Sequence, residues 1–209
     1  MTTPPPDRYE RAPRLPAGDS IDLRALVRHD GPLELEIGPG RGMFLRERVL
    51  AAPESAVIGL EIRRKWATLV DERLSREGLG DRARVFAEDA KEALPRLGPS
   101  GSLARAYVLF PDPWWKKRHT KRLVIGELLL QELARLLAPN GDLFIQTDVT
   151  ERAAEYTAAV AELPAFEPHG DVHGSPALEA NPYGARTNRE KRADEDGLPV
   201  HRMRWRRSG

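Results

Sequence analysis

The stretch Leu33-Glu34-Leu35-Glu36-Ile37-Gly38-Pro39-Gly40-Arg41-Gly42 decides the fold, because an apolar strand there turns through glycines into a helix. Small residues at such a turn let a ligand approach the main-chain N–H groups closely. The third glycine of the dinucleotide pattern G-x-G-x-x-G is missing, since Met43 stands in its place. Glu36, inside the strand, would repel a pyrophosphate and attract an ammonium or sulfonium group. Glu36, Gly38 and Gly40 therefore favour S-adenosylmethionine as cofactor, with phosphate dinucleotides as the runner-up.

Strands and helices alternate outward from this turn, which predicts an α/β fold. We expect strands at 56–60, 84–87, 107–110 and 142–148, and helices at 43–50, 66–74, 124–137 and 151–163. Such alternation builds a Rossmann-like, mostly parallel, doubly wound sheet with right-handed crossovers and helices on both faces. Residues 170–196 are polar and rich in turn formers, and residues 199–205 alternate like an antiparallel edge strand that closes the sheet.

Composition sets broad limits on the protein. The chain has 209 residues, enough for one domain with a substantial core. Residues 1–20 are rich in proline, and we expect a flexible segment there, followed by a single domain over 21–209. The 33 Lys and Arg balance 32 Asp and Glu, so only local clusters of charge can point to nucleic acid. The chain has no cysteine and no apolar run of membrane-spanning length, which fits a soluble, cytoplasmic protein without a membrane partner.

Two further acidic residues stand at the carboxyl ends of predicted strands. Glu61 follows the second strand about twenty residues after the glycine turn, where an acid can accept both hydroxyl protons of a ribose. Asp89 follows the third strand, in a place to accept from an adenine amino group. Either acid alone is more often a solvated residue at a strand end, but with Glu36 the three acids belong to three consecutive strands. The five histidines show no ligand spacing, so we expect no metal.

A basic, aromatic loop follows the predicted strand at 104–110. It reads Phe110-Pro111-Asp112-Pro113-Trp114-Trp115-Lys116-Lys117-Arg118-His119-Thr120-Lys121-Arg122 and joins a carboxylate, indole rings and five cations. The prolines exclude a helix and place Asp112 at the carboxyl end of the strand, where open α/β sheets bind ligands. Such a loop suits a nucleic-acid base with its phosphates. The alternative is a solvated basic turn with Trp114 packed against the sheet.

Taken in order, the glycine turn, Glu61, Asp89 and Phe110-Pro111-Asp112-Pro113-Trp114 resemble the bacterial tRNA (guanine-N7-)-methyltransferase family of the TrmB type. The match runs from about Leu33 to Trp205 and includes Phe144-Ile145-Gln146-Thr147-Asp148 and Thr187-x-x-Glu190-x-Arg192. The resemblance implies a class I methyltransferase fold and S-adenosylmethionine as cofactor. It further implies methyl transfer to N7 of a guanine in tRNA, at position 46 of the variable loop, by a monomer or a homodimer.

The resemblance also assigns roles to residues. Glu36, Glu61, Asp89 and Asp112 line the cofactor site, and Asp112 is the implied catalytic residue. Substrate contacts fall on Lys116, Asp148, Thr187, Asn188, Arg189 and Glu190. RNA-interacting residues are Lys117, Arg118, His119, Thr120, Lys121, Arg122 and Leu123. The chain departs from the family pattern at Trp115, where a proline or small polar residue is common, and at Arg189, where an aromatic residue is usual. The first departure affects how the loop leaves the strand, and the second argues against stacking at 189.

A mechanism follows from the chemistry of guanine. N7 carries a lone pair and no proton, so its methylation needs alignment rather than a general base. Asp112 is then an orienting acceptor for the N1–H and N2–H₂ edge, and Asp148 can act likewise from the neighbouring strand. The loop cations would hold the phosphates around a displaced base, since side chains cannot read the deep major groove of A-form RNA. Arg202, Arg204 and Arg206 share a face of the last strand, and they either extend this basic surface or keep an edge strand from pairing.

Other functions stay open at the level of sequence. A methyltransferase acting on a small molecule, a protein or another RNA would keep Glu36, Glu61 and Asp89, but a small molecule gives no use to five cations in seven positions. A non-catalytic RNA-binding relative would not need four carboxylates at strand ends. A nucleotide-dependent oxidoreductase is disfavoured by Glu36 and by the missing third glycine.

Overall fold

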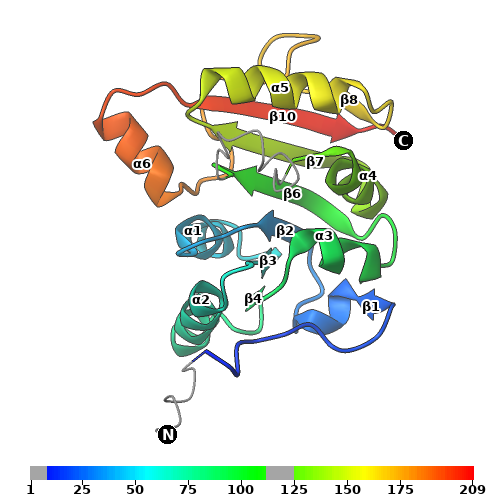
Figure 1. Cartoon of the computed structure of the whole chain (residues 1–209), viewed down its shortest axis with the longest axis vertical. Coiled ribbons are helices and arrows are strands. Elements are labelled where there is room, and N and C mark those ends of the chain that lie inside the picture. The colour runs from blue at the N-terminus through cyan, green and yellow to red at the C-terminus, as the bar shows by residue number, and fades with distance from the viewer. Residues whose placement is uncertain (1–8, 112–124) are drawn as a thin grey trace, which may run out of the picture.

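The computed structural model describes residues 9–111 and 125–209, and one large sheet forms the centre of this part (Figure 1). Its strands are β2 (Leu33–Ile37), β3 (Ala56–Leu60), β4 (Ala83–Phe86), β6 (Leu103–Leu109), β7 (Leu137–Thr147), β8 (Phe166–Pro168), β9 (Ala177–Leu178) and β10 (His201–Arg207). The strand order is β4-β3-β2-β6-β7-β10-β8, and β9 also pairs with β10. A separate small sheet joins β1 (Ile21–Asp22) to β5 (Leu97–Gly98).

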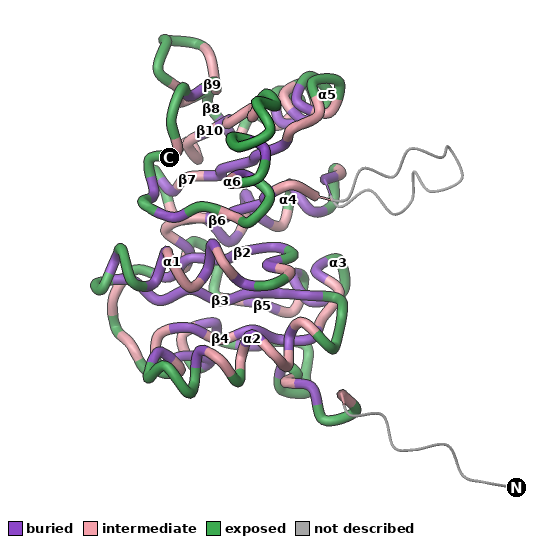
Figure 2. Tube along the Cα trace, turned by 90° about the vertical axis from the view of Figure 1, so that its left-hand side faces the viewer, coloured by how far each residue is buried: buried purple, intermediate pink, exposed green. Residues whose placement is uncertain are grey.

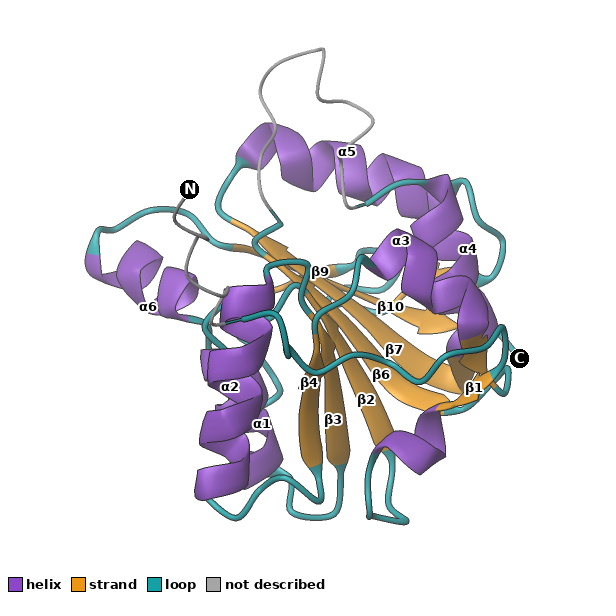
Figure 3. Ribbon diagram, turned by 60° about the horizontal axis from the view of Figure 1, so that its bottom comes forward, coloured by secondary structure: helices purple, strands orange, loops and turns teal. Residues whose placement is uncertain are grey.

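Helices cover both faces of the large sheet (Figure 3). They are α1 (Met43–Ala51), α2 (Arg64–Arg76), α3 (Ala90–Ala93), α4 (Glu127–Leu136), α5 (Thr150–Ala161) and α6 (Asn188–Glu195). Apolar residues of α3, α4 and α5 pack with one face of the sheet, and those of α1 and α2 pack with the other. The layers are those of a doubly wound α/β protein, as the alternation of elements predicts.

The direction of the strands creates a switch point at β2. Strands β2, β3 and β4 pair in parallel, and the chain then crosses to the other side of β2, where β6 and β7 continue the parallel pairing. In open α/β sheets, ligands bind outside the carboxyl ends of the strands where the order reverses. The carboxyl ends of β2 and β6 therefore mark the place to look for a site.

The two central strands are buried along their whole length. Every residue of β2 and β3 is buried, and Figure 2 shows this as continuous buried tube. On the α1 face, Phe44, Tyr107, Phe144 and Tyr183 form edge-to-face ring contacts, with centroids 4.8 Å apart for Phe44 and Tyr107. Such pairs add to the stabilisation from burial by about 0.5–1.5 kcal/mol each. They fix the loop that carries Tyr183 against the sheet.

Helix α6 is absent from the elements expected from sequence. Residues 170–196 show no apolar periodicity, yet Asn188–Glu195 is helical, with Thr187 as its N-cap. The side chain of Thr187 accepts a hydrogen bond of 2.9 Å from the main-chain N–H of Glu190. Only Glu190 and Ala193 of this helix are buried, so hydrophobic patterning could not reveal it. The Thr-x-x-Glu spacing of a capping box was the available signal.

The antiparallel strand expected near the C-terminus is present as β10, paired with β7 from His201↔Thr147 to Arg206↔Asp142. Its expected place at the edge of the sheet is wrong. Strands β8 and β9 pair with its other side, and β8 forms the edge. These two strands have three and two residues, too few for an alternating pattern to predict them.

Residues 9–20 are the described part of the segment expected to be flexible, and some of them pack against the domain. Ala12 and Leu15 are buried, at 7% exposure each. The main-chain N–H of Ala87, just after β4, donates to the carbonyl of Pro13 at 2.7 Å. Prolines lack an N–H but keep their carbonyl oxygen, so a proline-rich stretch can still pair along a strand end when nearby apolar residues have a surface to cover.

Candidate active site

The glycine turn at the end of β2 has three residues in the left-handed region, with φ of 71° at Gly38, 54° at Gly40 and 68° at Gly42. A Cβ at Gly42 would lie 2.3 Å from Cγ1 of Val70, so this glycine is needed for packing against α2. A Cβ at Gly38 would meet nothing within 4 Å, and one at Gly40 only the end of the Arg63 side chain, at 4.0 Å. The predicted ligand-facing glycines therefore border open space, which permits a close approach to the main chain.

Glu36 lies one residue from the end of β2 and is 2% exposed. Its Oε2 atom is buried and has no hydrogen-bond partner among residues 9–111 and 125–209. Burial, and after it the nearby charge of Glu61, raises the pKa of Glu36 to about 8. A buried carboxyl group with an unused oxygen is costly unless a ligand supplies a donor or a positive charge. An ammonium group meets that requirement, whereas a phosphate does not.

Glu61 follows β3 and is 1% exposed. Three hydrogen bonds hold its carboxylate in place. Its Oε2 accepts from the main-chain N–H of Gly40 at 2.8 Å. Its Oε1 accepts from the main-chain N–H of Arg63 at 2.9 Å and from Nε of Arg63 at 3.2 Å. The carboxylate therefore ties the glycine turn to the start of α2, at the place predicted for a ribose acceptor. Asp89 follows β4 as the N-cap of α3, where it accepts from the main-chain N–H of Lys91 at 2.9 Å.

Part of the predicted site lies outside the described residues: Asp112, Trp114, Trp115, Lys116, Lys117, Arg118, His119, Thr120, Lys121, Arg122 and Leu123. Phe110, two residues before Asp112, is within the described part of the chain. Phe110 has a φ of 47°, which is rare for a non-glycine residue and costs of order 1–3 kcal/mol. Its N–H donates to the carbonyl of Gln146 at 2.7 Å, and its ring packs on the aromatic cluster. Strained residues held by their surroundings are typical of functional sites.

Asp148 and the first turn of α6 lie on the same edge of the sheet as the glycine turn. Nε of Arg189 donates to Oδ2 of Asp148 at 2.6 Å, which joins α6 to the end of β7. Asn188 and Arg189 line a hollow of about 530 Å³ together with Arg41 of the glycine turn. The structure thus brings Asn188 and Arg189, two of the predicted substrate contacts, next to Arg41 of the turn predicted to hold the cofactor.

Glu190 is placed differently from the other predicted substrate contacts. It is fully buried, with Oε1 accepting from Nε of Arg202 at 2.9 Å and Oε2 accepting from the amide of Asn181 at 3.2 Å. Its observed contacts hold α6 to β10, and a direct contact with substrate stays a prediction. Arg204 donates to the carbonyl of His169, and Arg206 lies 3.8 Å from Asp142. Arg202, Arg204 and Arg206, three of the four arginines of β10, therefore each have an acceptor or an acidic neighbour within the fold.

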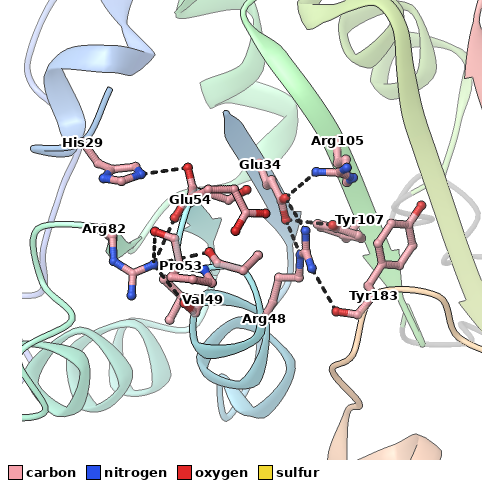
Figure 4. Close-up of polar contacts among 12 residues, drawn as sticks. His29, Glu34, Arg48, Val49, Pro53, Glu54, Arg82, Arg105, Tyr107 and Tyr183 are labelled. Atoms are coloured by element: carbon pink, nitrogen blue, oxygen red, sulfur yellow. Dashed lines mark hydrogen bonds and ion pairs between the residues drawn. The ribbon is translucent and has the colours of Figure 1, made fainter. Parts of the chain in front are cut away.

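A buried ionic network that no sequence motif indicated surrounds Glu34 of β2 (Figure 4). Glu34 is fully buried and accepts from Nε and Nη2 of Arg48 at 2.8 and 2.7 Å, from Arg105 at 2.8 Å and from the hydroxyl of Tyr107 at 2.8 Å. Burial alone would raise the pKa of Glu34, but these hydrogen bonds and cations lower it overall. A carboxylate inside an apolar strand must find partners, so Glu34 itself was the signal.

Within 9–111 and 125–209, no helix has the length and apolar character needed to cross a membrane. The same residues contain no cluster of three or more His, Asp or Glu arranged to hold a metal ion.

A buried carboxylate beside a glycine turn repels phosphate, and this separates the site from the dinucleotide-binding members of the Rossmann-like proteins. The fold is that of the Rossmann-like methyltransferases. A family model described as "Putative methyltransferase" matches residues 30–203. The crystal structure of TrmN from Thermus thermophilus has a similar fold, with a TM-score of 0.60 and 20% identity over 88% of this chain and 46% of that chain.

Relatives define the family more narrowly. The tRNA (guanine-N(7)-)-methyltransferase of Anaeromyxobacter dehalogenans is 40% identical over 174 residues, which cover 83% of this chain and 85% of that protein. The enzyme of the same name from Myxococcus xanthus is 36% identical over 174 residues, covering 83% of this chain and 82% of that protein. The chain belongs to the tRNA (guanine-N7-)-methyltransferase family, which confirms the resemblance noted in its motifs.

Proposed function

We propose that the protein transfers a methyl group from S-adenosylmethionine to N7 of a guanine in tRNA, at position 46 of the variable loop. The observation that carries the proposal is the buried, unpartnered Oε2 of Glu36 beside the glycine turn, in a chain whose relatives have this activity by name. We also propose that the enzyme acts in the cytoplasm, as a monomer or homodimer, and without a metal.

The described residues fit this cofactor. Glu36 would hold its ammonium group, because that group supplies both the positive charge and the donors that the carboxylate lacks. Glu61 would accept from the ribose hydroxyls, Asp89 from the adenine amino group, and the open main chain at Gly38 and Gly40 would lie against the ligand. The cofactor supplies an electrophilic methyl group on a sulfonium, whose departure leaves a neutral thioether.

The protein's task toward the guanine is orientation. N7 has no proton to lose, so the residues need only to present its lone pair in line with the methyl group and to stabilise the positive charge that develops on the ring. Asp112 is the proposed orienting and catalytic carboxylate, supported by Asp148, whose position Arg189 fixes. Lys116, Thr187, Asn188 and Glu190 complete the proposed substrate contacts, and residues 117–123 hold the RNA.

A direct test incubates the protein with unmodified tRNA transcript and isotopically labelled cofactor, followed by nucleoside mass spectrometry. We expect labelled 7-methylguanosine from the transcript and none from a matched transcript with adenine at position 46. Asp112→Ala should lower kcat strongly while cofactor affinity changes little. A label on another base or atom would contradict the proposal, and an equal yield from the adenine transcript would exclude position 46.

A further inference from the structure

Helix α1 is held at both of its ends. Its first turn follows the glycine turn directly, and its last turn is fixed by Arg82, whose Nη1 donates to the carbonyl of Val49 at 2.9 Å (Figure 4). A short helix held at both ends behaves as a rigid body. Any residue of α1 that binds another segment therefore sets the position of that segment relative to the glycine turn.

Glu47 of α1 binds the chain on either side of the first turn of α6. Its Oε2 accepts from the main-chain N–H of Arg186 at 2.8 Å, and its Oε1 accepts from Nζ of Lys191 at 2.5 Å. These two contacts bracket Thr187, Asn188 and Arg189, which are proposed to contact the substrate. The carboxylate of Glu47 thus holds both the residues that lead into α6 and the first turn of α6 itself.

Arg48, the next residue, binds the same segment from its other end. Its Nη1 donates to the carbonyl of Tyr183 at 2.9 Å, while the rest of its guanidinium group forms the paired contact with Glu34 (Figure 4). The backbone at Gly184 is close to α1, since a Cβ there would lie 3.2 Å from Cβ of Ala51. Residues 183–191, the α6 segment, are therefore attached to α1 at Tyr183, Arg186 and Lys191.

We propose that Glu47 and Arg48 are positioning residues for methyl transfer, which hold the α6 segment at a fixed place relative to the glycine turn and so align the guanine with the methyl group. The inference rests on the proposed function and adds residues that touch neither ligand. A displacement of about 1 Å in such an arrangement can lower the rate by about a hundredfold. Arg189 carries the constraint onward, because it binds Asp148 at the end of β7.

Glu47 is the better residue to test. Removing Arg48 would leave the buried carboxylate of Glu34 with fewer partners, which endangers folding. The Glu47–Lys191 pair is partly exposed, at 26% and 34%, so its loss should cost little stability. The chain offers a matched control one residue away: Arg46 of α1 pairs with Glu77 at 2.5 Å, at exposures of 37% and 32%, and this pair faces α2 rather than α6.

The experiment compares Glu47→Ala with Glu77→Ala in the full-length protein. Single-turnover methylation is measured at saturating tRNA, cofactor affinity by calorimetry without tRNA, and main-chain motion by hydrogen exchange. For Glu47→Ala we expect the methylation rate to fall about tenfold or more, cofactor affinity to stay within about twofold, and exchange to accelerate in residues 183–191. For Glu77→Ala we expect all three to stay near wild type. Glu47→Gln, which keeps an acceptor for the Arg186 N–H, should recover part of the rate.

The outcomes separate this inference from the proposed function. Wild-type protein that leaves tRNA unmethylated overturns the proposed function. Active wild type with an unchanged rate in Glu47→Ala overturns the positioning role, as does an equal loss in Glu77→Ala. Unchanged exchange in residues 183–191 overturns it too, because the attachment to α1 would then not control that segment.

Discussion

Glu36 and Glu61 lie at the ends of the adjacent parallel strands β2 and β3 but differ in their partners. Glu61 accepts three hydrogen bonds, while Oε2 of Glu36 accepts none from the residues that the structure describes. The two carboxyl groups therefore differ in how far the protein itself satisfies them. Glu61 is already fixed by the glycine turn and α2. Glu36 is buried beside Glu61, and burial, with the charge of Glu61 after it, raises its pKa to about 8.

Cofactor affinity should depend on pH with a maximum near 8. Glu36 has a pKa of about 8, so it is mostly protonated below that pH and attracts an ammonium group poorly. Affinity should rise by up to about tenfold per unit toward pH 8 and fall above it, as the α-amino group of the ligand loses its proton at about pH 8. Calorimetry from pH 6 to 9 measures this. Glu36→Gln should remove the rising limb, and a flat wild-type profile would contradict the assignment.

The same residue should lower the stability of the ligand-free protein at high pH. The pKa of Glu36 is raised above its ordinary 4.5, so the folded state binds a proton more tightly than the unfolded state, and stability falls as pH rises from about 4.5 to 8. Glu36→Gln should therefore raise the melting temperature at pH 8 and have little effect near pH 4.5. Thermal unfolding at both pH values tests this, and an equal shift at both would count against it.

The network around Glu34 should dominate the response of the fold to substitution. Glu34→Gln would leave Arg48 and Arg105 beside an uncharged amide in the interior, a loss of about 3–5 kcal/mol. Urea unfolding at pH 7 measures the change. Glu54→Gln, at an exposed position just after α1, is the control and should stay within about 0.5 kcal/mol of wild type. A loss below about 1 kcal/mol for Glu34→Gln would show that the network adds little.

Substitution of Gln146 should raise the stability of the fold, whereas substitution of Glu34 should lower it. Gln146 is fully buried on β7, and within the described part of the chain neither polar atom of its amide has a hydrogen-bond partner. Replacing unsatisfied buried polar atoms by an apolar group of similar size is neutral or stabilising, so Gln146→Leu should raise stability by about 1–2 kcal/mol. In a chain of this length, that is about 2–4 °C in melting temperature for each kcal/mol. A lower melting temperature would show that the amide is satisfied by ordered water.

Much of the fold could be predicted from sequence because its signals are local. Expected elements at 33–37, 43–50 and 56–60 agree with β2, α1 and β3 to within a residue. Strands β8 and β9 are too short to predict, and helix α6 lacks an apolar period, so that its capping box was its one local signal. The placement of Glu36, Glu61 and Asp89 at one edge followed from parallel pairing alone. The roles of residues 112–123 remain predictions.

The sequence by itself determined the wound sheet, the glycine turn and the acids at the strand ends, because periodicity and glycine placement act over a few residues. Only the tertiary structure decided which partner each buried charge has and where helix α6 lies. Those contacts join residues far apart in the chain: Arg48 binds Tyr183 across 135 positions, and Glu47 binds Lys191 across 144. No local sequence pattern predicts such pairs. A charged side chain in the fold requires a partner, and the tertiary path of the chain decides which distant residue becomes that partner.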